Sequence, residues 1–531
     1  MEFPIFPLVL AYAEIHYRFK KLSPAYYRKQ PEIIADIPHR LIKSSSNKLP
    51  VLLIIKDSHL FPVHLQDIKI NLFSSTNKTC TCSFILDQHL AKPYHALIRE
   101  ISLADFNIGD ELQVKVIIRY RCNETEFTVE NDNYHRLTQT VLKVKLIDPE
   151  LFGAQGWFAG EPHYHSNFTE DQVEFGADLN STVELARVMG LSWLFVTDHS
   201  YDLDDLPGSW TEIDQGLAKW TEMRAQCRKL DTADLRIIPG EELSIGNSKD
   251  KNVHLLVIAN SAFIPGRGDS AEIWFQNRPT HNISELPSLL EDTALLAAAH
   301  PFEKIPWSQK LTLRRGNWRS EDLLSAGIRF LQLINSNNPR QIKRSLNRWK
   351  KYLLRGHRFL IIAGNDAHGN FNIMRQIKIP FLRLFTSRKQ IFGKFMTLFQ
   401  YPENDPLPGL IQGRVIVSNG PFLDFTLSGD DQTVHIGQVS DMRRGKLNFK
   451  LCLSEEQDRI SRFRLHIGDL ESKREQIRKN PPNGCELTLP ARGYIRMSLL
   501  TKRGGMAFTN PIWISAEIND QKRNDLSRES S

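Results

Sequence analysis

Short apolar runs alternate with stretches of helical periodicity through the middle of the chain. The runs are β-prone and of strand length, at residues 156–160, 192–196, 235–239, 253–259, 294–299, 328–334 and 359–363. Helical periodicity separates several of them, around residues 182–189, 217–230 and 339–354. Strands separated by helices of ordinary length indicate parallel βαβ units. About seven strands are too few for a regular eight-stranded barrel, so the pattern predicts an α/β fold with a distorted seven-stranded (βα) barrel.

The pattern changes to period-two alternation on both sides of this region. Before it, residues 51–55, 65–72, 82–86, 111–120 and 137–146 alternate or run apolar, which predicts an antiparallel sandwich. After it, residues 389–400 predict a helix, and residues 414–518 predict a second β domain. The expected domains are an N-terminal β-rich domain at 1–150, the barrel at 151–400, a C-terminal β-sandwich-like domain at 410–518 and a polar tail at 519–531.

Metal-capable side chains follow the central strands one group at a time. The groups are His163 with His165, Asp198 with His199, Glu241 with Glu242, His300, and Asp366 with His368. The carboxyl ends of parallel strands meet at one rim of a barrel, so these side chains are expected to lie together. His254 instead begins its run, so that strand is expected to run against its neighbour or to form a hairpin. Imidazole and carboxylate ligands without cysteine suit Zn, Mn or Fe.

The order of these motifs, H-x-H, T-D-H, G-x-E, H, H-P and D-x-H along roughly residues 155–370, resembles the PHP (polymerase and histidinol phosphatase) superfamily of metal-dependent hydrolases. The run Gly-Arg-Val-Ile-Val-Ser-Asn-Gly-Pro at 413–421 is similar to one in the CehA/McbA-like branch of that superfamily. The resemblance implies two or three divalent metal ions per chain.

The resemblance also implies a ligand set for each ion. The first would be held by His163, His165, Glu242 and Asp366, the second by Glu242, His254 and His300, and the third by His199, His368 and one residue from the loop after His165. Both Glu170 and Asp171 stand where the family places that last ligand, and Asp171 is the expected one. The G-x-E spacing favours Glu242 over Glu241, and Glu161 stands where the family has an acidic residue before the first histidine.

Four further residues are candidates for supporting roles. Asp198 is expected to orient an imidazole, with an ordinary loop cap as the alternative. Asn335 is expected to hydrogen-bond the substrate or a bound water. Arg340 and Arg344 follow at helical spacing and are candidate contacts for an anionic substrate, with a solvated helix face as the alternative.

Composition narrows the class of protein without selecting a substrate. The 531 residues are 41% hydrophobic and 24% charged, which is ordinary for a globular chain, and the net charge of +7 favours anionic partners in a general way. The six cysteines lack zinc or redox spacing, the N-terminus is a poor signal peptide, and no run has the length of a membrane span. A cytoplasmic protein without a membrane segment or a nucleic-acid module is therefore expected.

The expected activity is hydrolysis of a phosphoester by a metal-activated water, as the superfamily resemblance implies. Hydrolysis of a carboxyl ester, carbamate or amide is the alternative that the CehA/McbA resemblance implies. The expected substrate is an anionic small-molecule or polymeric ester. A catalytically silent scaffold, or a module that binds glycans or proteins, is the alternative from a different class.

Overall fold

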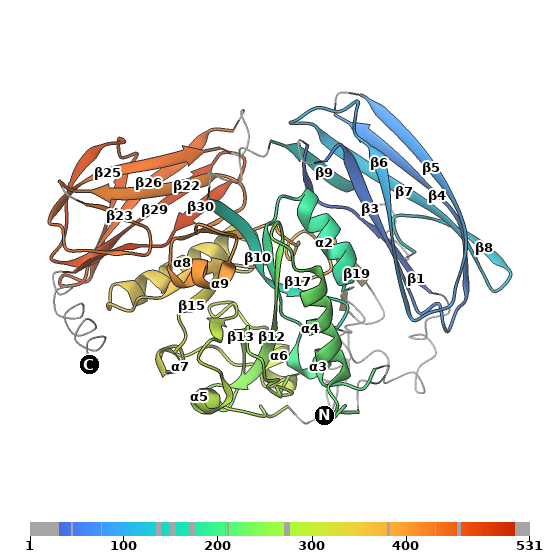
Figure 1. Cartoon of the computed structure of the whole chain (residues 1–531), viewed down its shortest axis with the longest axis horizontal. Helices are drawn as coiled ribbons and strands as arrows, with labels where there is room; N and C mark the ends of the chain where they lie inside the picture. Colours follow the sequence, from blue (N-terminus) through green and yellow to red (C-terminus); the bar gives the residue numbers. More distant parts are fainter. Residues whose placement is uncertain are drawn as a thin grey trace, which may run out of the picture.

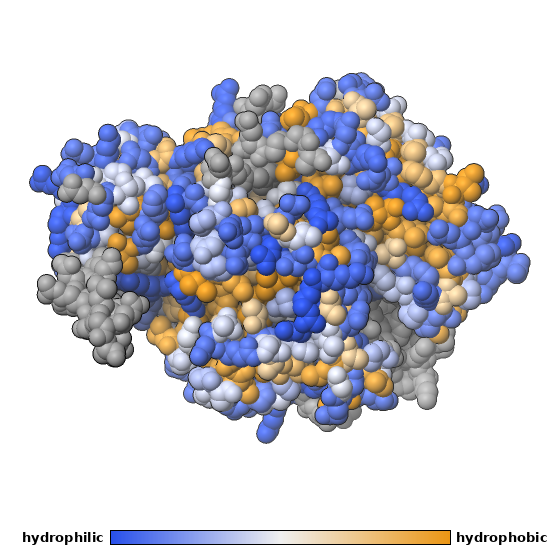
Figure 2. All heavy atoms as spheres, viewed as in Figure 1, coloured by the Kyte–Doolittle hydropathy of each residue, from blue (hydrophilic) through white to orange (hydrophobic). Residues whose placement is uncertain are grey.

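The computed structural model contains two β-rich regions on either side of a central region (Figure 1). It describes residues 31–43, 46–75, 77–133, 140–148, 156–169, 176–207, 209, 212–269, 277–325, 327–379, 383–430, 432–453 and 458–515. The predicted tail at 519–531 lies outside these residues. Figure 2, in the same view, shows hydrophilic residues over most of this face with hydrophobic residues between them. Among the described residues, no helix combines the length and apolar character needed to cross a membrane.

The N-terminal region consists of two sheets. The smaller joins β1 (Glu32–Asp36), β3 (Lys48–Lys56) and β6 (Tyr94–Ser102). The larger runs in the order β2 (Arg40–Ile42), β9 (Leu142–Ile147), β7 (Glu111–Cys122), β4 (Val63–Ser74) and β5 (Thr79–Leu90), with β8 (Thr125–Glu130) on β7. Every second residue of β7 is buried, from Leu112 to Cys122. Because alternate side chains of a strand point to opposite faces, one face of this sheet packs on a core and the other faces solvent.

The central strands follow one another in the sheet as they do in the sequence. They are β10 (Trp157–His165), β11 (Trp193–Val196), β12 (Arg236–Gly246), β13 (Asn252–Ile258), β14 (Leu295–Ala298), β15 (Phe330–Ile334) and β16 (Leu360–Ala363). The longer helices between them are α2 (Leu179–Val188), α4 (Ala218–Leu230) and α8 (Pro339–Leu353). Shorter helices are α3 (Ser200–Leu203), α5 (Leu286–Leu289), α6 (Trp307–Thr312) and α7 (Ser320–Ser325).

The predicted α/β fold with a seven-stranded (βα) barrel is wrong. The central strands belong to a 16-stranded mixed sheet that continues past β10 through β20 (Met396–Gln400) and β21 (Val415–Ser418) and ends beyond β29 (Arg492–Thr501), so the chain is mostly β. β13 runs antiparallel to both β12 and β14. The short link between β12 and β13 allows only a hairpin, because a parallel crossover needs a dozen or more residues. Residues 389–400 were also predicted as a helix, and their last part is instead strand β20, paired with β10 and β21.

Two side chains cover the free edge of β16, which ends the sheet. Asn510 accepts a hydrogen bond from Ile361 N at 2.7 Å and donates to Ile361 O at 3.0 Å. Thr397 Oγ1 lies 2.8 Å from both N and O of Ala363, accepting from the first and donating to the second. These bonds satisfy edge backbone groups that would otherwise be buried without partners.

The C-terminal region shares the large sheet with the central region. β26 (Ile460–Asp469), β27 (Arg474–Lys479), β29, β30 (Met506–Thr509) and β31 (Ile512–Ser515) belong to it, together with β24 (Val439–Ser440). A second sheet holds β23 (Thr433–His435), β22 (Phe422–Ser428), β25 (Arg444–Cys452) and β28 (Cys485–Thr488). One buried cluster contains Trp193, Phe330, Phe399 and Val415, so the central strands share a core with β20 and β21.

Candidate metal centre

The strand ends bring eight of the nine predicted ligands together. His163 and His165 end β10, His199 follows β11, Glu242 and His254 lie on β12 and β13, His300 follows β14, and Asp366 and His368 follow β16. Their ligand atoms form three groups, each with all atoms within 4.8 Å of one another. The groups are His163, His165, Glu242 and Asp366; then Glu242, His254 and His300; then His165, His199 and His368. The ninth predicted ligand, Asp171, and its alternative Glu170 lie outside the described residues.

The first group has the spacing of a metal coordination shell. The Nε2 atoms of His163 and His165 are 3.0 Å apart, and they lie 3.3 and 3.2 Å from Oδ1 of Asp366. Each is also 3.4 Å from one carboxylate oxygen of Glu242. Ligand atoms about 2.0–2.2 Å from a tetrahedral or octahedral ion lie roughly 2.9–3.6 Å from one another. These four side chains therefore fit a divalent metal ion without rearrangement.

The second group shares Glu242 with the first. Oε1 of Glu242 lies 2.7 Å from Nδ1 of His254 and 3.2 Å from Nε2 of His300. The carboxylate therefore faces the imidazoles of both groups.

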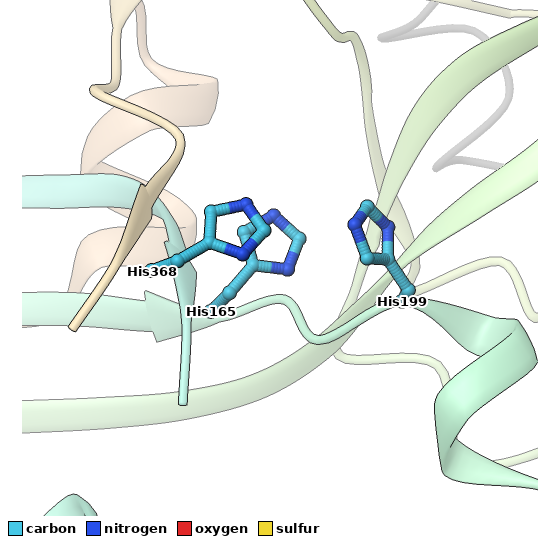
Figure 3. Close-up of side chains that lie close together, drawn as sticks. All are labelled: His165, His199 and His368. Carbon is cyan, nitrogen blue, oxygen red and sulfur yellow. The ribbon is translucent and has the colours of Figure 1, made fainter. Parts of the chain in front are cut away.

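The third group is made of imidazoles alone, and its three rings lie close together in Figure 3. The ring centroid of His165 is 4.3 Å from that of His199 and 4.1 Å from that of His368. Nδ1 of His199 lies 3.1 Å from Oε2 of Glu242. His165 thus belongs to the first and third groups, as Glu242 belongs to the first and second.

Two buried atoms of the centre lack well-formed hydrogen bonds. Oε2 of Glu242 and Nδ1 of His199 make none with the residues that the structure describes, despite facing each other. Buried polar atoms are rarely left in this state unless an ion or water binds them. The lack of hydrogen bonds at these two atoms supports the same conclusion as the distances: these clusters can hold metal ions.

The charges of the buried side chains at the centre favour the binding of a cation. Burial alone would raise the pKa of Glu242, but His254 and His163 outweigh it and hold that pKa well below its usual value. Burial would lower the pKa of His163, but the charges of Glu242 and Asp366 raise it to about 9. Burial and the neighbouring His165 lower the pKa of His199 to about 3. The centre thus combines ionised carboxylates with a neutral imidazole, and a metal ion would displace the protons that it otherwise attracts.

Two ligand residues have backbone conformations that non-glycine residues seldom adopt. His300 has φ of 30° and Asp366 has φ of 51°. Such conformations cost about 1–3 kcal/mol each and persist where the surroundings enforce them, often at functional sites. The strain lies at the two turns that aim His300 and Asp366 at Glu242 and His163.

Side chains behind the ligands fix their orientation. Gln332 Oε1 lies 2.8 Å from Nδ1 of His163, and Asp269 Oδ2 lies 2.9 Å from Nε2 of His254. Arg315 Nη1 donates to the same oxygen of Asp269 at 2.8 Å. A partner on the second ring nitrogen leaves the first nitrogen free to bind a metal.

The predicted residue Asp198 organises the loop after His165. It accepts hydrogen bonds from N and Oγ of Ser166 at 2.7 and 2.8 Å, and from N and Oγ1 of Thr169 at 3.1 and 2.9 Å. Thr169 Oγ1 in turn lies 3.3 Å from Nδ1 of His165. Asp198 thus acts on an imidazole through Thr169 and belongs to none of the three groups.

The predicted residue Asn335 lies beside the carboxylate of Asp366. Its Nδ2 donates to Oδ2 of Asp366 at 3.4 Å and to Oε2 of Glu303 at 3.1 Å. Gln390 Nε2 donates to the same oxygen of Asp366 at 3.1 Å. These amides hold Oδ2 while Oδ1 faces the histidines.

Arg340 and Arg344 are exposed on α8, and neither side chain has a hydrogen bond or ion pair with the ligand groups in the described part of the chain. The structure thus leaves them on a solvated helix face. Glu241 is also outside the groups, because it points the other way: its Oε2 accepts from Ser200 Oγ at 2.9 Å. Glu161 accepts from the backbone of His163 and Asn365, which ties β10 to the turn carrying Asp366.

Sequence reasoning missed Gln332, Asp269 and Gln390. Gln332 could have been found from the sequence, because it is a polar residue inside an apolar strand run. The structure shows that it is fully buried. Asp269 and Gln390 lie in segments without a motif, and their contacts depend on chain segments that meet only in the fold.

Comparisons with known proteins do not assign the chain to a family. No family model matches the chain, and neither does any curated protein. Solved structures that resemble it include a β-glucuronidase of Parabacteroides merdae, at 8% identity and a TM-score of 0.20 over 92% of this chain and 65% of that one. Another is a β-D-mannosidase of Dictyoglomus thermophilum, at 9% identity and a TM-score of 0.21 over 91% of this chain and 66% of that one. The chain spans less than two thirds of either enzyme's length, and likeness at this level indicates neither a shared fold nor a shared activity.

Proposed function

We propose that this protein is a metal-dependent hydrolase of the PHP type, which uses two or three divalent ions, Zn, Mn or Fe, to cleave a phosphoester. One observation carries the proposal: three ligand groups are joined through Glu242 and His165. Joined groups suit hydrolysis because neighbouring ions bind both the attacking water and the ester. The motif order along the sequence supports the same class.

The chain's own residues would hold and orient the reacting groups. Bound metal ions would supply a water of lowered pKa and neutralise charge on the ester oxygens. Glu242 and Asp366 stay ionised at neutral pH, so they hold negative charge at the centre. Asn335 Nδ2 lies at the edge of the centre, where it would exchange its long bond to Asp366, at 3.4 Å, for an ester oxygen while Gln390 keeps Asp366 in place.

A phosphoester ranks ahead of a carboxyl ester, carbamate or amide because the superfamily resemblance implies phosphoester cleavage. The branch resemblance supports the second class of substrate. A silent scaffold would be expected to have lost ligands, whereas eight ligands converge in the described residues.

Hydrolysis assays on ligand variants test the proposal. Purified protein, supplied with Mn or Zn, is given p-nitrophenyl phosphate, bis(p-nitrophenyl) phosphate, p-nitrophenyl acetate and an aryl carbamate. His163→Ala and His165→Ala should lower phosphoester hydrolysis by at least about 100-fold, since loss of a supporting partner alone costs 10–100-fold. His281→Ala, a histidine outside the three groups, is the matched control. Activity on the acetate or carbamate alone would select the second class, and equal activity in all variants would overturn the proposal.

A further inference from the structure

Helix α8 and the strands on either side of it, β15 and β16, belong to a stretch of the chain without a carboxylate. No Asp or Glu lies between Asp322 and Asp366, whereas the same stretch contains nine Lys or Arg. A stretch of this kind in a chain with 61 acidic residues concentrates positive potential in one place. The side chains of α8 decide where that potential is presented.

The cations of α8 lie on the side of the helix that faces solvent. Its other side, which includes Ile342, Trp349 and Leu353, is buried in a hydrophobic core. Most of the exposed cations are three or four residues apart, the spacing that places side chains on one side of a helix. We call the five exposed cations the cationic ridge: Arg340, Lys343, Arg344, Arg348 and Lys351.

Nearby carboxylates do not neutralise the cationic ridge. None of its five side chains forms an ion pair with the residues that the structure describes, and Arg348 instead lies 6.0 Å from the ring centroid of Phe302. A helix rises about 1.5 Å per residue, so the ridge from Arg340 to Lys351 extends about 17 Å. Figure 1 shows α8 beside the C-terminal β-rich region and away from the N-terminal region. The ridge is thus long enough to meet several anionic groups at once.

A segment with exposed apolar side chains starts and ends in contact with α8. At its start Phe302 O accepts a hydrogen bond from a side chain of α8 at 3.0 Å, and at its end Ser320 Oγ lies 2.9 Å from Oη of Tyr352. Between these contacts, α6 carries Trp307 and Leu311 one helical turn apart, with 64% and 60% of their surfaces exposed. A segment held at both ends by α8 therefore presents an apolar pair to solvent.

We propose that the cationic ridge binds the surface of a membrane that contains anionic lipids, with Trp307 and Leu311 inserted among the lipid headgroups. Lysine and arginine near such a surface are attracted by its negative potential, and each cation strengthens binding about fivefold. Tryptophan suits the boundary between water and lipid because its ring is apolar and its N–H is polar. Charge attraction and buried apolar area together determine how strongly a protein binds such a surface.

The same charges would also attract a nucleic acid, but the other side chains favour a membrane. Besides its cations, the exposed side of α8 carries Pro339 and Asn347 and no aromatic ring on which a base could stack. The aromatic side chains of the helix, Trp349 and Tyr352, are buried. The apolar pair on α6 adds surface that a phosphate backbone cannot use. Binding through the ridge needs no metal ion, so the inference does not depend on the proposed function.

Sedimentation of the full chain with lipid vesicles tests this inference. Vesicles of phosphatidylcholine alone are compared with vesicles of equal parts phosphatidylcholine and phosphatidylserine. The protein should bind the anionic vesicles in preference, and added salt should weaken that binding. Lys343→Gln with Arg344→Gln should raise the lipid concentration needed for half-maximal binding by at least about tenfold, because two cations are lost. The matched control, Lys69→Gln with Lys92→Gln, removes the same charge from exposed positions in the N-terminal region and should bind as the unmodified protein does.

A second pair of variants tests the apolar contact. Trp307→Ala with Leu311→Ala should weaken binding to anionic vesicles at least about fivefold, because less apolar surface is buried. Leu60→Ala with Ile108→Ala, at exposed apolar positions of the N-terminal region, is the control and should have no effect. Unchanged binding in the first of these variants would overturn the insertion of Trp307 and Leu311.

Three results would overturn the inference as a whole. The first is equal binding of the two glutamine variants to anionic vesicles. The second is equal binding of the unmodified protein to neutral and anionic vesicles. The third is tighter binding of single-stranded or duplex DNA than of anionic vesicles, which would identify a nucleic acid as the partner of the ridge.

Discussion

Gln332 Oε1 lies 2.8 Å from Nδ1 of His163, so this imidazole donates its Nδ1–H to the amide oxygen. Nε2 is then the nitrogen left to bind a metal ion, and it faces Asp366 and Glu242. The amide cannot turn over, because its Nε2 donates to Gly364 O at 2.9 Å and to Asn335 Oδ1 at 3.1 Å. One buried glutamine thus selects the tautomer of the first ligand.

Replacing Gln332 by leucine should weaken metal binding while keeping the volume of the side chain. The affinity for Zn should fall about 10–100-fold, the usual effect of removing the partner of a metal-bound imidazole. Gln332→Glu keeps an acceptor for His163 and should lose less. Competition with a chelating dye measures both values. Unchanged affinity in the leucine variant would show that the hydrogen bond does not set the tautomer.

Asn510 makes the C-terminal region part of the metal centre's support. Asn510→Ala leaves N and O of Ile361 buried without partners, and each such group costs about 1–3 kcal/mol. The free energy of unfolding should therefore fall by about 2–6 kcal/mol. Metal content should fall with it, because β16 leads to Asp366 and His368. Chemical denaturation and elemental analysis check the two effects, and Thr397→Val should act in the same direction at the neighbouring residue Ala363. Stability and metal content equal to those of the unmodified protein would contradict this role.

A buried polar network in the C-terminal region resembles a hydrolytic triad in its connections. Ser498 Oγ lies 2.9 Å from Nε2 of His466, whose Nδ1 lies 3.1 Å from Oε1 of Glu475. Arg496 also binds both oxygens of Glu475 at 3.0 and 2.8 Å. Ser498 is only 5% exposed in the middle of β29, so we assign the network to stability.

The ionisation of Glu475 should make the free energy of unfolding depend on pH in the acid range. Burial opposes ionisation, but His466 and Arg496 outweigh it and lower the pKa of Glu475 to about 2. A carboxyl with a depressed folded-state pKa stabilises the fold above its unfolded pKa of about 4.5. This stabilisation, on the order of 3 kcal/mol, is lost as the pH falls from about 4.5 to 2. Urea unfolding at pH 3 and pH 7 should show that Glu475→Gln is destabilised mainly at pH 7. Glu486→Gln, at an exposed position, is the control, and an equal loss at both pH values would exclude the linkage.

The eight converging candidate ligands were predictable because each of them except His254 is a polar side chain that follows an apolar run. Local pattern identifies such positions without knowledge of the topology. The fold was harder to predict from the sequence, because strand direction and edge pairing depend on residues far apart in the chain. His254 hinted at the reversed strand β13, but nothing local shows that residues 396–400 pair with β10 or that Asn510 reaches Ile361. The supporting residues Asp269 and Gln390 were missed for the same reason.

The metal content of the purified protein tests the central claim most directly. Elemental analysis after incubation with Mn or Zn should find two or three ions per chain. His199→Ala should lower that number by about one, because His199 belongs to a single group, and His281→Ala should leave it unchanged. An absence of bound metal in the unmodified protein, or equal metal content in His199→Ala, would contradict the account.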